Sequence, residues 1–184
     1  MYVWLIMLLS GSKVYLRNMK YAIRKIDVNT DIPVLFEIDN NNQFNGDLLC
    51  KLKYNSYNEF NRLLVENLNS FFHDSFIITC ASSIVGVFYT YDYRFYDCNC
   101  KINICFLKSV LTEADFKNII KGMITSIFRD YPLKKIIAEV SSEDVELYKF
   151  YESIGFAKEC TLSEYKFFNG HYIDVHIMEN VRKG

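Results

Sequence analysis

One segment constrains the fold of this chain more than any other: a run of apolar residues at helical spacing that ends at a proline. The apolar positions follow the i, i+3, i+4, i+7, i+8 pattern of one helix face. They are Phe116, Ile119, Ile120, Met123, Ile124, Ile127, Phe128 and Tyr131, and Pro132 follows them. The stripe predicts an amphipathic helix, beginning near Thr112, whose apolar side must pack against another layer of the protein.

The segments on either side of this helix predict the layer that covers it. Residues 102–107 and 134–140 are short runs rich in β-branched and other apolar residues, which is typical of buried strands. Because a helix connects the two strands, we expect them to lie parallel in one sheet.

The C-terminal third continues the alternation of strands and helices. The pair Ser141–Ser142 is expected to cap a second amphipathic helix, which ends at Gly155. Two last strands, over residues 157–168 and 171–179, meet at Asn169–Gly170, the strongest hairpin signal in the chain. The order strand, helix, strand, helix, strand, strand predicts an α+β fold of three layers around a mixed, mostly antiparallel sheet.

The N-terminal half predicts further strands and helices. Residues 12–26 mix apolar and basic side chains as a half-buried strand would, and residues 31–33, Asp-Ile-Pro, predict the start of a helix with the Asp as its cap. The Asn-rich residues 39–46 are expected to form an exposed loop. Residues 57–73 carry a helical apolar face, and residues 76–88 predict two antiparallel strands.

The second of those strands continues through aromatic residues at alternate positions: Tyr89, Tyr91, Tyr93 and Phe95. Alternate residues of a strand share a face, so the four rings are expected to form one row. Such a row could be the wall of a ligand groove. The alternative is aromatic packing between neighbouring strands.

Composition and charge limit the classes that remain. The chain has 184 residues, 51% of them hydrophobic, with 2 Pro and 7 Gly, which favours one well-packed domain over residues 1–184. Its 21 basic and 22 acidic residues leave a formal net charge of −1, without the excess of a nucleic-acid binder. The apolar residues 1–10 are about half the length of a membrane span and lack signal-peptide flanks, so we expect a hydrophobic strand or an N-terminal extension that docks on the domain.

The six cysteines are expected to be reduced, as in the cytoplasm. No Cys-x-x-Cys pair occurs, and several cysteines lie in apolar runs, where a free thiol behaves as a small hydrophobe. Cys98 and Cys100 are the one close pair, and the three histidines are scattered, so no metal site is predicted.

Five stretches of the sequence carry a resemblance to a known family. They are GSKVYLRNMK, SIVGVF, FRDYPLKKIIAEV, LYKFYESIGFAKE and EYKFFNGHYIDVHIME, and together they span roughly residues 11–182. The chain resembles the GNAT acyltransferase superfamily, in particular its branch of ribosomal-protein and spermidine acetyltransferases. The resemblance implies transfer of an acetyl group from acetyl-CoA to an amine, by direct attack on a thioester held between two splayed strands, here residues 102–108 and 135–140.

The resemblance also implies catalytic residues. Tyr151 stands where the family places the tyrosine that protonates the leaving thiolate, a task that suits a phenol with a pKa near 10. The alternative is a core tyrosine, because Tyr151 belongs to the apolar stripe of its helix. Glu139 is an acidic residue in an apolar strand and a candidate general base if it is partly buried, or else a solvent-facing strand residue.

Other positions are implied to bind the donor. Phe106, Leu107 and Lys108, at the end of the first splayed strand, are expected beside the thioester. Asp144 stands where relatives often carry an Asn that contacts the pantetheine, although an acidic residue there is also explained as a stabiliser of the helix N-terminus.

The phosphate-binding loop departs from the family pattern. Relatives carry Gln/Arg-x-x-Gly-x-Gly/Ala at the start of the long helix, where backbone N–H groups hold the CoA pyrophosphate. The segment Leu111–Phe116 aligns there without a glycine and with two acidic residues, Glu113 and Asp115. Thr112 and Ala114 are the donor-binding candidates in this segment, and Thr112 with Asp115 also fits a capping pair.

Three hypotheses follow from this departure. In the first, acetyl-CoA binds through backbone and pantetheine contacts, and the protein is an N-acetyltransferase that acts on a primary amine of a small molecule or protein. In the second, the donor is an acyl carrier protein, whose arm carries a single phosphate diester. In the third, the fold is a binding module without catalysis. Assembly as a homodimer is compatible with all three.

Overall fold

The computed structural model describes residues 21–46, 48, 54–110, 114–168 and 170–182, so the expected strand before Tyr21 and the apolar extension lie outside the described residues. One sheet runs through the molecule in the order β1-β3-β4-β5-β6-β8-β7, and β2 pairs with β5 beside this path. The strands are β1 (Tyr21–Lys25), β2 (Phe44–Asn45), β3 (Phe72–Cys80), β4 (Ser83–Arg94), β5 (Asn99–Leu107), β6 (Lys135–Ser141), β7 (Ala157–Phe168) and β8 (His171–Val181).

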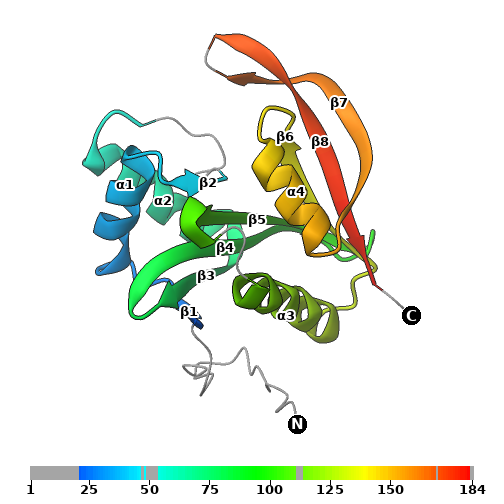
Figure 1. The fold of residues 1–184 in the computed structure, drawn as a ribbon, viewed down its shortest axis with the longest axis horizontal. Coiled ribbons are helices and arrows are strands. Elements are labelled where there is room, and N and C mark those ends of the chain that lie inside the picture. Colours follow the sequence, from blue (N-terminus) through cyan, green and yellow to red (C-terminus); the bar gives the residue numbers. More distant parts are fainter. Residues whose placement is uncertain (1–20, 47, 49–53, 111–113, 169, 183–184) are drawn as a thin grey trace.

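Four helices and a short 3-10 turn complete the described fold. The helices are α1 (Asp31–Asn40), α2 (Tyr57–Ser70), α3 (Ala114–Asp130) and α4 (Val145–Ser153), and the turn η1 covers Lys108–Val110. Helices α1 and α2 lie on one face of the sheet and α3 and α4 on the other, with the long β7–β8 hairpin at one edge (Figure 1). We call these sides the α1–α2 face and the α3–α4 face. The three-layered α+β prediction is confirmed.

The burial of the strands follows from this layering. Ile102 and Ile104 of β5 and Ala138 of β6 are buried in the core below α3 and α4. Ile77 of β3 and Val87 of β4 belong to a second core with α1 and α2. Because successive side chains of a strand alternate between faces, the neighbours of these residues point to the opposite side of the sheet.

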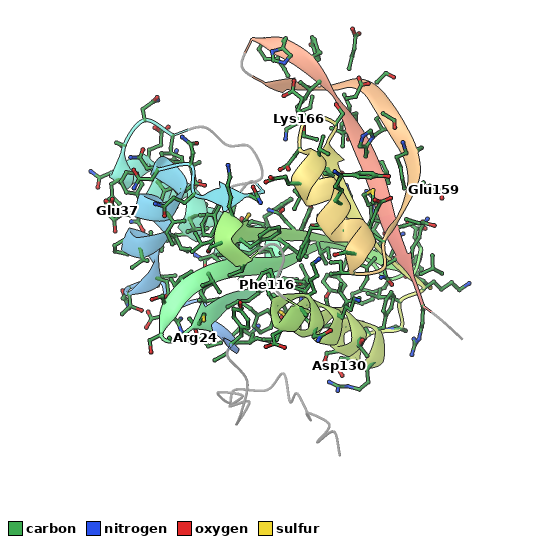
Figure 2. All side chains as sticks on the ribbon, in the orientation of Figure 1. Arg24, Glu37, Phe116, Asp130, Glu159 and Lys166 are labelled. Atoms are coloured by element: carbon green, nitrogen blue, oxygen red, sulfur yellow. The ribbon has the colours of Figure 1, made fainter. Side chains whose placement is uncertain are left out.

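The predicted long helix is confirmed, with all of its apolar stripe up to Phe128 buried. Phe116, close to the start of α3, is fully buried and packs against Phe106, Phe150 and Tyr21 at ring separations of 5.5 to 5.9 Å. Figure 2 shows its side chain between α3 and the sheet.

Three local predictions are wrong. The expected loop over residues 39–46 contains the end of α1 and the buried strand β2, because pairing with β5 supplies backbone partners that an isolated segment lacks. Asp31 is not a cap: it is the first residue of α1, and its carboxylate is bonded to Arg24. The cap of α4 is not the serine pair but Asp144, whose carboxylate accepts from Leu147 N at 2.9 Å.

The predicted aromatic row is also wrong. Tyr89 and Tyr91 lie on the α1–α2 face, whereas Tyr93 packs with the core below α3 and meets Tyr131 at 4.9 Å. Asp92 has a φ of 48° and interrupts the pairing of β4 with β5, and this irregularity sends the following side chains to the other face. Tyr89 instead shows the alternative of aromatic packing between neighbouring strands, because its ring stacks on Phe72 of β3 at 4.1 Å.

Candidate active site

The site is built where two parallel strands separate. Among the described strand pairs, β5 and β6 form the one parallel pair, and its register covers only residues 99–101 with 135–137. Beyond this point residues 102–105 of β5 keep their pairing with β4, and residues 138–141 of β6 keep theirs with β8. The inner edges of the two strands therefore enclose an opening whose backbone groups can bind a ligand.

Helix α4 lies over this opening on the α3–α4 face. Its residue Phe150 meets Phe106 of β5 with ring centroids 4.4 Å apart, while the helix itself packs on β6. Its neighbour Tyr151 is 1% exposed, and the ring of Tyr151 meets Phe156 edge-on at 5.0 Å. Tyr151 is therefore a core residue, as one of the two sequence-based alternatives predicted, and it lies on the helix that borders the opening.

On the opposite face, a charged network marks the end of the β5–β6 pairing. Glu139 lies on the α1–α2 face of β6 and accepts from Lys101 Nζ at 2.8 Å; their side chains are 20% and 26% exposed. The ammonium group of Lys101 also lies 3.5 Å from Asp92. Burial opposes the charge of Lys101, but the hydrogen bond and charge of Glu139, together with Asp92, raise the pKa of Lys101 above its ordinary value.

Glu139 is half-buried and paired with Lys101. Its role as a general base stays a prediction. A carboxylate in this place can accept a proton, provided that its partner Lys101 moves or is replaced by a cationic group of a ligand.

The predicted donor-binding residues are spread over the end of β5 and the two helix starts. The Phe106 side chain is buried and its backbone lies between β2 and β4, whereas Leu107 is half-buried. Lys108 and Ala114 are exposed, at η1 and at the first position of α3. The remaining two are Asp144, which caps α4, and Thr112, which lies outside the described residues with Glu113.

Phe116 stands at the position of the last glycine or alanine of the family's phosphate-loop pattern. A Cβ on Gly86 of β4 would lie 3.4 Å from the Phe116 ring, so the ring fills the space directly above the sheet. The position that would be glycine in the family pattern is therefore a core position in this chain.

Two residues near the opening were missed by sequence reasoning. Asn45 of β2 is 6% exposed and donates from Nδ2 to Glu146 Oε2 of α4 at 3.4 Å, which connects the β5 side of the opening to the helix that follows β6. Asn45 belongs to the stretch that was expected to be a loop, and no local pattern distinguishes it from its neighbouring asparagines. Lys101 was missed because a lysine in a strand is ordinarily a solvated residue.

Other chemistry is limited within the part of the chain that the structure describes. No group of three His, Cys, Asp or Glu side chains is placed to hold a metal ion there. The described cysteines, Cys80, Cys98, Cys100, Cys105 and Cys160, are all free thiols. None of the described helices is long and apolar enough to cross a membrane.

A sheet opened between two parallel strands, with helices on both faces, defines the acyltransferase class that the sequence resembles. The chain matches the family described as Acetyltransferase (GNAT) domain over residues 22–177. The protein belongs to this family and is an acetyltransferase.

Among the solved structures with the same fold are spermidine N-acetyltransferases. A SpeG chimera from Vibrio cholerae and hSSAT has 20% identity and a TM-score of 0.70, covering 89% of this chain and 96% of that one. A dodecameric spermidine N-acetyltransferase from Vibrio cholerae has 20% identity and a TM-score of 0.68, with coverage of 88% and 94%. No curated protein sequence matches this chain.

Proposed function

We propose that this protein transfers an acetyl group from acetyl-CoA to a primary amine by direct attack in a ternary complex. The observation that carries the proposal is the opening between β5 and β6, where the pairing stops after Lys101 and Ile137. The family match over residues 22–177 supports the reaction type.

The chemistry assigns one task to each side of the opening. The amine nitrogen forms a bond to the thioester carbon, the carbon–sulfur bond breaks, and the sulfur leaves as a thiolate. Glu139, from the α1–α2 face, takes the proton that the attacking ammonium must lose. Tyr151, from the α3–α4 face, returns a proton to the thiolate, and a backbone N–H of β5 polarises the carbonyl.

In this proposal the acceptor's ammonium group competes with Lys101 for Glu139. A primary alkylammonium has the same chemistry as the Lys101 side chain, which already lies 2.8 Å from that carboxylate. The similar solved structures are spermidine acetyltransferases, and this supports an aliphatic amine as the first acceptor class to examine.

The donor is proposed to bind without a glycine-rich cradle. Phe106, Leu107 and Lys108 are the proposed donor residues at the end of β5, and Ala114 and Asp144 are those at the starts of α3 and α4, where free N–H groups favour an anion. Thr112 is proposed as a donor residue from the sequence alone. Exposed Asp115 opposes a diphosphate at the same place, so the affinity for CoA is expected to be modest.

Thermal unfolding with acetyl-CoA, CoA and pantetheine tests the donor. At one hundred times its dissociation constant a ligand adds about 2.7 kcal/mol of stability, which raises the unfolding midpoint of a domain this size by about 5 to 10 °C. We expect such a shift with acetyl-CoA and CoA. An amine panel that includes spermidine, with release of CoA thiol as the readout, then identifies the acceptor.

Two results would contradict the proposal. No shift with any of these ligands would favour a carrier-protein donor or a binding module. A shift with acetyl-CoA but no thiol release with any amine would contradict the acceptor class. The proposal also places the reaction in the cytoplasm. It further takes the protein to be a homodimer, and light scattering of the purified protein tests this oligomeric state.

A further inference from the structure

The short strand β2 places a buried amide beside the opening between β5 and β6. We propose that Asn45 binds the pantetheine arm of acetyl-CoA, with Nδ2 donating a hydrogen bond to an amide carbonyl of the arm, and that Glu146 holds the Asn45 side chain in place until the donor arrives. The inference rests on the proposed function, because it takes acetyl-CoA as the donor.

The pairing of β2 with β5 determines where the Asn45 side chain points. Asn45 is the register partner of Phe106, and directly paired residues of an antiparallel ladder share a face. Phe106 belongs to the core below α3 and α4, so Asn45 lies on the α3–α4 face. Its neighbour Phe44 packs in the other core with α1 and α2. In Figure 1, β2 lies between the α1–α2 pair and α4.

This position is at the entrance of the opening, which we call its mouth: the end where β2 pairs with Phe106 and Leu107 of β5. Residues 102–105 of β5 lie just before the two residues that β2 covers, and they are not paired with β6. In this proposal, a donor whose phosphates lie at the start of α3 passes between β2 and α4 to place its thioester between the strands.

The backbone that follows Asn45 lies directly against β5. Gly46 has a φ of +90°, and a Cβ there would lie 2.5 Å from the backbone oxygen of Ile104. The chain therefore touches β5 directly after Asn45, and only a glycine permits so close an approach.

The partner of Asn45 in the structure is one that a ligand can replace. The separation of Nδ2 from Glu146 Oε2 is 3.4 Å, longer than the 2.9 to 3.0 Å typical of a strong N–H···O bond. Glu146 is exposed and its carboxylate can turn into water, whereas Asn45 is 6% exposed and needs a partner for its amide. A carbonyl oxygen of the donor satisfies that need.

The facing helix offers no amide for the same task. Asp144 has only acceptor oxygens when ionised, and its carboxylate caps Leu147 N at 2.9 Å. The pantetheine arm carries two amide groups whose carbonyl oxygens require donors. Asn45 is the side-chain donor that the described structure places on the β2 side of the mouth.

Binding of acetyl-CoA and of acetyl-pantetheine, measured by calorimetry on the full chain, tests the proposal. Acetyl-pantetheine has the amides but lacks the diphosphate. Asn45→Leu keeps the branched outline of the side chain and removes the amide, so we expect about tenfold weaker binding of both donors. Glu146→Ala removes the partner that the donor must displace, so we expect both donors to bind several-fold more tightly.

A matched control separates this effect from simple charge removal. Glu143→Ala deletes a carboxylate just before the same helix, but Glu143 contacts His171 on the hairpin and not Asn45. We expect Glu143→Ala to leave acetyl-pantetheine binding unchanged.

The outcomes distinguish the possible failures. If Asn45→Leu binds both donors like the unaltered protein, Asn45 does not bind the arm. If Glu146→Ala changes the affinity for acetyl-CoA alone, Glu146 acts on the diphosphate through its charge, and the proposal that it holds the Asn45 side chain is wrong. Because Glu146 is a surface residue, this variant remains informative even if Asn45→Leu does not fold. If the unaltered protein binds neither donor, the proposed acetyl-CoA donor itself is overturned.

Discussion

At the scale of single residues, Tyr151 has both a structural and a proposed chemical role. Its ring belongs to the core below α3 and α4, where it meets Phe156 edge-on. Removal of the hydroxyl alone keeps that contact and deletes the proton that the leaving thiolate takes up in the proposed mechanism. For this reason Tyr151→Phe separates packing from chemistry.

We expect Tyr151→Phe to lower kcat by about 100-fold or more, the usual effect of losing a general acid, with the dissociation constant of acetyl-CoA changed less than about twofold. Steady-state kinetics and calorimetry measure the two quantities. Tyr148→Phe is the control, because Tyr148 is a half-buried tyrosine of the same helix that contacts His176. Equal loss of turnover and donor affinity in Tyr151→Phe would remove Tyr151 from the proton transfer.

A second residue, Asp74 of β3, connects stability to pH. Its carboxylate accepts from Lys25 Nζ at 2.6 Å and lies 3.3 Å from both His73 Nδ1 and the Tyr131 hydroxyl. Burial alone would raise the pKa of Asp74, but the hydrogen bonds and charges of Lys25 and His73 lower it below its ordinary 3.8. Burial, with the charge of Asp74, raises the pKa of Tyr131 to about 12.

A carboxyl whose pKa is lower in the folded state stabilises the fold above its unfolded pKa, and this stabilisation is lost as the pH falls through the folded value. Asp74→Asn is therefore expected to cost about 1 to 3 kcal/mol at pH 7 and progressively less as the pH falls below the ordinary 3.8 of the carboxyl. Urea unfolding at several pH values measures both. The control is Asp97→Asn, in the exposed β4–β5 turn; a difference between Asp74→Asn and the unaltered protein that does not vary with pH would contradict the linkage.

At the scale of elements, β2 is the strand that depends most on its surroundings. It has two residues, Phe44 and Asn45, and its pairing with β5 requires Gly46 to approach the Ile104 backbone. A strand of this length has no stability of its own, so its contacts with β5 decide whether it forms.

Gly46→Ala is expected to destabilise the protein by about 1 to 3 kcal/mol, because alanine at this φ is strained and its Cβ meets the backbone. Gly122→Ala is the matched control: it lies inside α3, and an added Cβ meets nothing within 4 Å. The control should gain about 0.5 to 1 kcal/mol from helix propensity. Urea unfolding measures both, and a Gly46→Ala variant as stable as the unaltered protein would mean that β2 need not lie against β5.

At the scale of the whole molecule, two hydrophobic cores share one sheet. Phe60 of α2 packs in the core of the α1–α2 face, and Ile120 of α3 packs in the core of the α3–α4 face. Strands β4 and β5 contribute side chains to both cores. At the outer edge, Glu159 and Lys166 mark the two ends of β7 (Figure 2).

Because the strands are shared, we expect the chain to unfold as one domain. Phe60→Ala should cost about 3 to 5 kcal/mol and Ile120→Ala about 2 to 5 kcal/mol, and each should lower the midpoint of a single transition. Far-UV and near-UV circular dichroism measure backbone and aromatic packing in the same samples. Two separate transitions, each moved by one variant, would mean that the two layers are independent units.

Much of the fold could be predicted because it depends on local patterns. The stripe from Phe116 to Phe128 determines both the helix α3 and the side that it buries, and Gly155, with a φ of +102°, ends α4 where the sequence predicts. These are properties of a segment and its own periodicity.

The sequence by itself therefore determined the order of the elements other than β2, the buried sides of the long helices and the family. Only the tertiary structure decided which distant groups meet: Lys101 with Glu139, Asn45 with Glu146, and Tyr93 with Tyr131 on the face to which the irregularity at Asp92 sends it. Periodicity is encoded within a few residues, whereas a partner 38 or 101 positions away along the chain is chosen by the packing of the whole sheet.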